Sequence, residues 1–183
     1  MDRLEEAFAA IPRAGFIPSG ADPRVDGPIA IGHGQTNSQP RTVAAMLRLL
    51  DVRPGQRVLD VGAGSGWTTA LLAYLVGPQG EVRGVERVPQ LVRMGDSHLA
   101  ATSQPWASIR VSSPGQIGLP AAAPFDRILV SAEAGELPQD LVAQLNDRGR
   151  MVIPVRGIMT LIVRDGELMS TSTHGRYRFV PLL

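Results

Sequence analysis

The hydrophobic residues follow two spacings along the chain, one typical of strands and one typical of helices. Short apolar runs rich in branched residues predict buried strands. Five such strands are expected, at Val58–Val61, Glu81–Glu86, Ser108–Val111, Pro124–Ala132 and Gly149–Val155. Segments with apolar residues three or four positions apart predict helices. These helices are expected at Asp2–Ala10, Arg41–Leu50, 67–76, Pro89–Ala101 and Pro138–Leu145.

The pattern changes after residue 155, where no helical segment separates the strand-like runs. Three such runs lie at Met159–Arg164, Glu167–Thr173 and about Arg176–Val180. Alternating strands and helices followed by strands alone predict an α/β fold. We expect a doubly wound, mostly parallel sheet with an antiparallel C-terminal edge.

Length and composition narrow the class of protein. A chain of 183 residues is the size of a single domain with a sizeable core. We divide this domain into an N-terminal segment (1–56), a core (57–155) and C-terminal strands (156–183). No apolar run approaches the ~20 residues of a membrane span, and the acidic start MDRLEEAF has no apolar signal core. We therefore expect no membrane partner and a cytoplasmic location.

Residue types exclude several kinds of chemistry. The chain has no cysteine, and its three histidines are scattered, so no metal site is expected. All 18 basic residues are arginine, and 17 acidic residues balance them without leaving a basic stripe. We expect no nucleic-acid partner.

The strongest motif is VLDVGAGSGWTTALLA at Val58–Ala73, a strand followed by three alternating glycines and a helix. Gly62, Gly64 and Gly66 let the backbone take positive φ and approach a ligand closely. The helix that follows offers unpaired N–H groups and a positive dipole end. The alternative is a strand–helix turn whose glycines serve only close packing.

Spacing and acidic residues favour one nucleotide cofactor over another. The dinucleotide fingerprint G-x-G-x-x-G would need its third glycine at Trp67, so NAD fits poorly. Asp60 precedes the glycines, and Glu86 ends the second strand, where a carboxylate can accept both ribose hydroxyls. This pattern is similar to that of S-adenosylmethionine (AdoMet) methyltransferases with a Rossmann-like sheet.

A polar loop precedes the helix at Arg41–Leu50. Thr36, Asn37 and Ser38 stand where a helix N-cap belongs. Capping accounts for one of these residues, and for Ser38 we weigh it against a catalytic or substrate-binding role.

Together, the motifs resemble one family, the protein-L-isoaspartate O-methyltransferases. The matching segments are IPRAGFIP, IGHGQTNSQP, VLDVGAGSGWTTALLA, VERVPQL, APFDRILVSAEAGELPQDLVAQL, GRMVIPV and FVPLL. The resemblance implies the class I AdoMet-dependent methyltransferase fold with a seven-stranded sheet. It also implies methyl transfer from AdoMet to the α-carboxyl of isoaspartyl residues in damaged proteins or peptides, leaving S-adenosylhomocysteine (AdoHcy). We expect a monomer or weak dimer.

The resemblance also assigns roles to residues. Ser38 would be catalytic, Thr36 would lie near the sulfonium, and Glu86 would hold the ribose. The full set expected at the cofactor is Thr36, Asp60, Gly62, Ala63, Gly64, Gly66, Trp67, Glu86, Arg87, Pro114 and Gly115. The set expected at the substrate is Arg24, Asp26, Asn37, Val180 and Pro181.

Four departures from the family pattern motivate alternatives. Arg24 stands where an aromatic residue is usual, Asn37 where an apolar one is usual, and Pro114 where an aspartate is expected at the adenine. The chain also begins later than the usual N-terminal helices. One alternative is a divergent relative that methylates another carboxylate, of an aspartyl peptide natural product or a small acid. The other is a non-catalytic AdoMet-binding protein.

Overall fold

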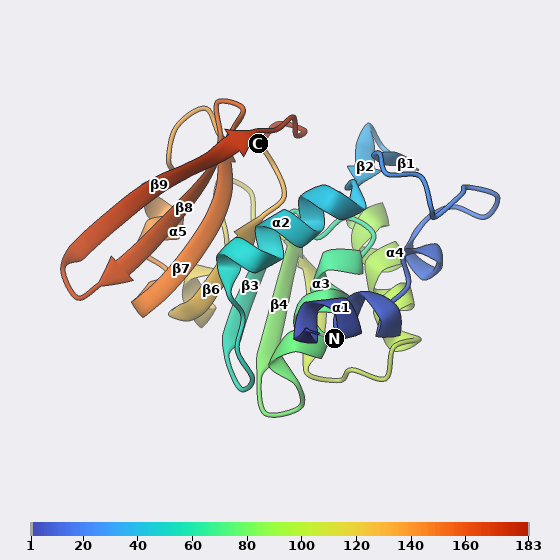
Figure 1. Ribbon diagram of the computed structural model, residues 1–183, viewed down its shortest axis with the longest axis horizontal. Helices are drawn as coiled ribbons and strands as arrows, with labels where there is room; N and C mark the ends of the chain where they lie inside the picture. Colours follow the sequence, from blue (N-terminus) through green and yellow to red (C-terminus); the bar gives the residue numbers. More distant parts are fainter. Residues whose placement is uncertain (1, 183) are drawn as a thin grey trace.

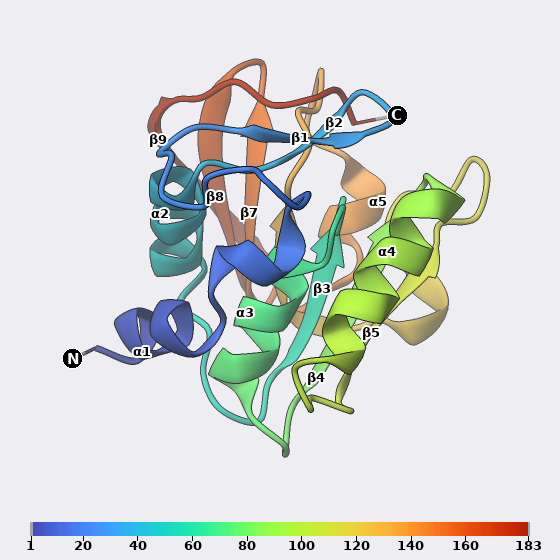
Figure 2. The same cartoon turned by 90° about the vertical axis from the view of Figure 1, so that its right-hand side faces the viewer.

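Seven strands form one sheet in a computed structural model of the protein, which describes residues 2–182. The strand order is β5-β4-β3-β6-β7-β8-β9. Figure 1 shows the sheet from β4 to β9, and Figure 2 labels β5. The strands are β3 (Arg57–Val61), β4 (Glu81–Glu86), β5 (Ala107–Val111), β6 (Phe125–Val130), β7 (Leu145–Val155), β8 (Ile158–Asp165) and β9 (Leu168–Arg176). The strands from β5 to β7 are parallel, and β8 runs antiparallel to both of its neighbours. The predicted fold class is confirmed.

Helices and turns cover both faces of the sheet. The helices are α1 (Arg3–Ala10), α2 (Pro40–Leu50), α3 (Trp67–Val76), α4 (Pro89–Ala100) and α5 (Gln139–Val142), with short 3₁₀ turns η1 (Arg13–Phe16) and η2 (Pro120–Ala122). One apolar core joins α1, α2, α3 and α4 to one face, and a second joins α5 and its neighbours to the other. Helix α3 is apolar nearly all round because the sheet lies on one side of it and α1 on the other.

A small two-stranded hairpin stands apart from the main sheet. Its strands, β1 (Ile29–Gly32) and β2 (Gln35–Asn37), pair antiparallel above the carboxyl ends of the parallel strands. Figure 2 shows the hairpin and the C-terminal tail crossing the same end of the molecule. The hairpin and the C-terminal tail, which are far apart in sequence, thus meet where β3 and β4 end.

Two predicted elements are wrong. The segment Arg176–Val180 is not a strand beyond Arg176, because the main chain leaves the sheet edge and pairs instead with the loop after β6. There the N–H of Glu133 donates to the carbonyl of Val180, and the N–H of Leu182 donates to the carbonyl of Glu133, both at 2.7 Å. The helix expected at Pro138–Leu145 is only four residues long because β7 already begins at Leu145.

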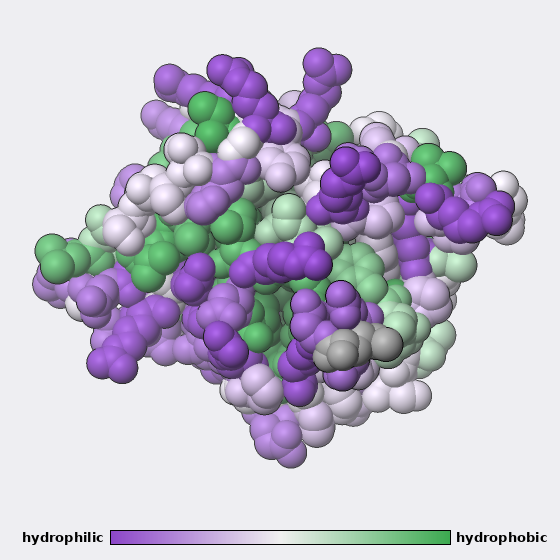
Figure 3. All heavy atoms as spheres, viewed as in Figure 1, coloured by the Kyte–Doolittle hydropathy of each residue, from purple (hydrophilic) through white to green (hydrophobic). Residues whose placement is uncertain are grey.

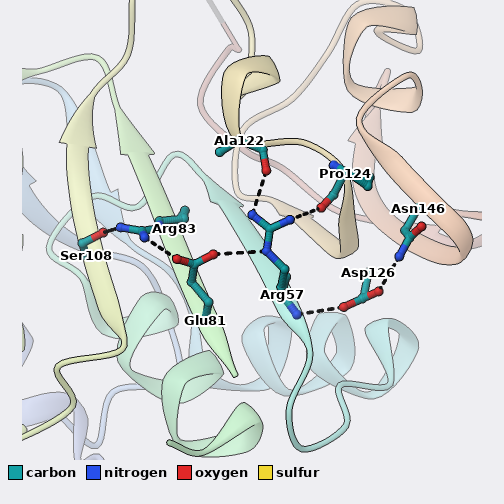
Figure 4. Close-up of polar contacts among 8 residues, drawn as sticks. All are labelled: Arg57, Glu81, Arg83, Ser108, Ala122, Pro124, Asp126 and Asn146. Atoms are coloured by element: carbon teal, nitrogen blue, oxygen red, sulfur yellow. Dashed lines mark hydrogen bonds and ion pairs between the residues drawn. The ribbon is translucent and has the colours of Figure 1, made fainter. Parts of the chain in front are cut away.

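The amino ends of the strands are joined by a charged network, shown in Figure 4. The Arg57 guanidinium donates to the Glu81 carboxylate at 3.2 Å and to the carbonyls of Ala122 and Pro124, both at 2.8 Å. Glu81 also accepts from Arg83. This network ties β3 and β4 to the turn before β6 and lies at the opposite end of the sheet from the hairpin.

Strand β9 forms one edge of the sheet and is exposed along most of its length. Figure 3 shows apolar atoms gathered over the β8–β9 region, and Leu168 and Met169 are 74% and 41% exposed. Four of the other seven residues of β9 are Ser or Thr, so this part of the strand presents a polar surface. Within residues 2–182, no helix is long and apolar enough to cross a membrane.

Candidate active site

A cavity lies at the carboxyl ends of β3, β4 and β6, where ligands bind in open α/β sheets. Three segments enclose it: the glycine-rich loop after β3, the hairpin strand β2 with the residue that follows it, and the C-terminal tail. Predicted residues that line the cavity are Thr36, Asn37, Ser38, Gly62, Ala63, Gly64, Trp67, Glu86, Arg87, Val180 and Pro181. The fold therefore brings together most of the residues that the sequence singled out.

The glycine loop turns sharply between β3 and α3. Gly62, Gly64 and Gly66 have φ of 81°, 54° and 89°, all in the left-handed region that favours glycine. A Cβ on Gly66 would lie 3.1 Å from the carbonyl oxygen of Gly95 on α4. The loop is thus held against α4 while its other side faces the cavity.

Glu86 ends strand β4 and is 6% exposed. One carboxylate oxygen accepts from the Gly64 N–H at 3.1 Å and the other from the Val88 N–H at 2.9 Å. These two bonds fix the plane of the carboxylate against the glycine loop. Each oxygen keeps a further lone pair for a donor in the cavity.

Asp60 lies beneath the glycine loop and does not line the cavity. Its side chain is fully buried, and one carboxylate oxygen accepts from the hydroxyls of Thr69 and Thr68 at 2.7 and 2.8 Å. Burial raises the pKa of Asp60, the two hydroxyl donors lower it and the nearby Glu86 raises it, and together these effects bring the pKa to about 6. Asp60 therefore anchors the first turn of α3 rather than facing a ligand.

Ser38 lies between β2 and α2 and is half-buried in the cavity wall. The N-cap of α2 is Gln39, and no side chain caps this helix. The capping alternative for Ser38 is therefore wrong. No hydrogen bond from the Ser38 hydroxyl is found within residues 2–182, so this group remains available to a ligand.

Asn37 is buried, although it lies beside Ser38. Its amide oxygen accepts from Nε of Arg13 at 2.7 Å, and its amide nitrogen donates to the hydroxyl of Ser65 at 3.1 Å. The amide therefore joins protein groups to one another, instead of presenting a free polar group to a substrate as the sequence suggested.

Two residues expected at the substrate lie outside the cavity. Arg24 has a side chain 88% exposed and pairs with Asp22 at 3.0 Å. Asp26 pairs with Arg41 at 2.5 Å, also at the surface. Arg24 thus pairs within the loop before the hairpin, and Asp26 pairs with the first turn of α2.

Pro114 and Gly115 line a shallow depression that adjoins the main cavity. Arg87, Ser112 and Gln116 line both hollows. The two hollows are thus continuous along the end of β4.

Trp67 lines the cavity but also has a structural role. Its ring is 3% exposed and its Nε1 donates to the carbonyl of Ile11 at 3.0 Å. The ring of Phe8 packs edge-on against it, with ring centroids 5.6 Å apart. Trp67 therefore fastens the N-terminal segment to the start of α3.

Several residues at or behind the cavity were not predicted: Arg13, Ser65, Gln116, Ser131, Ala132 and Leu182. For Arg13 a signal existed, because it is the one charged residue in the apolar segment IPRAGFIP. Ser65 lies within the predicted glycine loop but was given no role of its own. The remaining four come from loops whose course depends on tertiary contacts. Across the described residues 2–182, no group of three or more His, Asp or Glu side chains is placed to hold a metal ion.

Comparison with known proteins agrees with this geometry. The family model for protein-L-isoaspartate(D-aspartate) O-methyltransferase matches residues 1–183. The chain belongs to this family. A protein-L-isoaspartate O-methyltransferase of Methanopyrus kandleri is 43% identical over 190 residues, which cover all of this chain and 84% of that protein. One of Methanothrix thermoacetophila is 45% identical, covering all of this chain and 88% of the relative.

A solved structure shares the architecture. It is a putative protein-L-isoaspartate O-methyltransferase of Plasmodium falciparum in complex with S-adenosyl-L-homocysteine. Its TM-score is 0.90 at 28% sequence identity, and the match covers all of this chain and 91% of the other. The family fold therefore extends over the whole chain, hairpin and tail included.

Asp60 makes stability depend on pH. The folded state holds the Asp60 proton more tightly than the unfolded chain, so the free energy of unfolding falls as pH rises from about 4 to 6. Asp60→Asn removes this dependence, and between pH 4 and 7 the variant should gain roughly 3 kcal/mol relative to the wild type. Urea unfolding across this pH range measures the difference. Glu136→Gln, at an exposed carboxylate, is the control, and a constant wild-type-to-Asp60→Asn difference would contradict the assignment.

Proposed function

We propose that the protein transfers a methyl group from AdoMet to the α-carboxyl of L-isoaspartyl residues in proteins or peptides. The observation that carries this proposal is the position of Ser38, whose free hydroxyl lines the same cavity as the glycine loop and Glu86. Membership of the family over the full chain supports it. The proposed partners are cytoplasmic proteins or peptides that carry isoaspartyl residues.

The cavity suits AdoMet in shape and in polar groups. Glu86 offers both carboxylate oxygens to the ribose hydroxyls from a position that two backbone N–H groups already fix. The glycine loop holds the methionine end, where Gly62, Ala63 and Gly64 leave room for a ligand against the backbone. When bound, AdoMet supplies an electrophilic methyl on a positively charged sulfur.

The adenine lies toward Arg87 in this proposal. Pro114 offers neither a carboxylate nor an N–H there. Gln116 lines both adjoining hollows, and its side-chain amide supplies the polar contact that Pro114 lacks. The departure at Pro114 is therefore compatible with cofactor binding.

The acceptor needs orientation more than activation. A carboxylate is already ionised at pH 7, so no strong general base is required. Ser38 donates a hydrogen bond that aims one carboxylate oxygen at the methyl group, and Thr36 lines the same side. A neutral hydroxyl orients the nucleophile without quenching its charge, as an ammonium group partly would. Opposite charges cancel as the methyl moves, so an enclosed cavity favours the reaction.

The alternative of a different carboxylate substrate loses its main support in this geometry. Arg24 motivated a different carboxylate substrate, yet its guanidinium points to Asp22 at the surface. Asn37 motivated altered recognition, yet both ends of its amide are bonded to protein groups. No observation favours a second function over methyl transfer to isoaspartyl residues.

The direct test of this function uses a matched pair of peptides, one isoaspartyl and one aspartyl. Labelled methyl from AdoMet should appear as base-labile label on the isoaspartyl peptide alone. Ser38→Ala should lower kcat/KM roughly 10- to 100-fold, because a hydrogen bond to a charged group contributes about 1.5–3 kcal/mol. Ser170→Ala, on the exposed strand β9, is the control and should retain full activity. Equal labelling of both peptides, or label on neither by protein that binds AdoHcy, would overturn the proposal.

Glu86 should matter for cofactor binding, both through its own carboxylate and through the glycine loop that it fixes. Glu86→Gln replaces one acceptor oxygen by a donor, so the Kd for AdoHcy measured by calorimetry should rise roughly 10-fold or more. Glu81→Gln changes the same residue type at the other end of β4, within the network of Figure 4, and should leave the Kd unchanged. Equal Kd values for the Glu86 variant and the wild type would remove Glu86 from the cofactor site.

A further inference from the structure

A buried hydrogen-bond network of three side chains links the hairpin wall of the cavity, formed by β2 and Ser38, to the glycine loop. Arg13 donates to Asn37, and Asn37 donates to Ser65. Their residues are 5%, 4% and 2% exposed, in the same order. Asn37 holds the central position, where the family resemblance leads one to expect an apolar residue.

The direction of each bond in this network is forced. Nε of Arg13 can only donate, so the amide oxygen of Asn37 must face it at 2.7 Å. The amide nitrogen must then face Ser65, whose hydroxyl oxygen accepts at 3.1 Å. The hydroxyl proton of Ser65 is thereby directed away from Asn37.

Arg13 cannot turn to change this arrangement. Its other nitrogens donate to the carbonyls of Val25 and Gly27, both at 2.8 Å, and of Ser38 at 3.0 Å. Its guanidinium also lies 5.6 Å from the centre of the Trp67 ring. The same arginine thus fixes the backbone of Ser38 and the amide of Asn37.

Ser65 is held on its other side as well. Its carbonyl accepts from Nδ1 of His98 on α4 at 2.8 Å. Within residues 2–182, the Ser65 hydroxyl has no bond in which it is the donor. Ser65 lines the cavity beside Gly64, where the methionine end of the cofactor is proposed to lie.

We propose that Ser65 is a further cofactor-binding residue, whose hydroxyl donates to the carboxylate of the methionine end, and that Asn37 is the positioning residue that aims it. Arg13 fixes the orientation of the Asn37 amide and therefore the direction of both hydrogen bonds that the amide makes. This inference rests on the proposed function only for the identity of the cofactor. It explains Asn37 as a connector inside the protein, with no change in acceptor specificity.

Asn37→Asp tests the direction of the hydrogen bonds. The introduced carboxylate still accepts from Arg13, but it also accepts from Ser65, which turns the hydroxyl proton away from the cavity. We expect the thermal midpoint to be kept or raised and the Kd for AdoHcy, measured by calorimetry, to rise about 10-fold. Ser65→Ala should raise the Kd for AdoHcy to the same degree, because it removes the same hydrogen-bond donor. The double variant should lose no more affinity for AdoHcy than either single variant does, since both changes act on one hydrogen bond.

Ser108→Ala is the matched control, because that hydroxyl lies in the network of Figure 4 at the far end of the sheet. It should bind AdoHcy as the wild type does. An unchanged Kd in Ser65→Ala would overturn the inference. A double variant whose rise in Kd equals the product of the two single rises would also overturn it. If Asn37→Asp fails to fold, Ser65→Ala alone decides. Failure of the wild type to bind AdoHcy would instead count against the proposed function.

Discussion

The guanidinium of Arg13 lies beneath the hairpin that forms one wall of the cavity, and the arrangement of that wall depends on it. Burial lowers the pKa of Arg13, and the nearby Asp26 opposes this effect. The cost of burying the charge is offset by bonds to carbonyls of the loop before the hairpin and to Asn37 and Ser38. A loop with little regular structure thereby gains a fixed course.

This constraint explains how the site is assembled from distant segments. Glycines place the backbone after β3 close to the cavity, and Glu86 fixes that loop from the end of β4. Arg13 and Asn37 then attach the hairpin wall to the same loop through Ser65. The tail closes the third side by pairing with Glu133. The charged network of Figure 4 joins strands at the opposite end of the sheet, away from the cavity at the carboxyl ends.

Local signals predicted the parts of the fold that local sequence determines. The strand, glycine loop and helix at Val58–Ala73 were recognisable because their spacing and residue types specify backbone conformation directly. The segment Arg176–Val180 has strand-like residues, but its partner is decided by a loop far away in the chain, and no periodicity reveals that choice. Arg24 was misplaced for a different reason. Its role was carried over from the family pattern, whereas its ion pair with Asp22, two residues away, keeps it at the surface.

The candidate site shows the same division. Ser38, Glu86, Gly62 and Gly64 stood out from their motifs and line the cavity. Gly66 belongs to the same motif but does not line the cavity, because it packs against Gly95 of α4. Asp60 belongs to the same motif, yet its alternating position in β3 directs it beneath the loop toward Thr68 and Thr69. Whether a polar residue faces a ligand or supports a neighbour depends on packing, which the sequence specifies only through contacts between distant elements.

In the proposed complex, the glycine loop and the hairpin wall bind the cofactor as one connected unit. Amide hydrogen exchange, followed with and without saturating AdoHcy, tests it most directly. We expect slower exchange in both the glycine loop at 61–67 and the hairpin wall at 35–38 when AdoHcy binds. Protection confined to the glycine loop, with unchanged exchange in the wall, would contradict it.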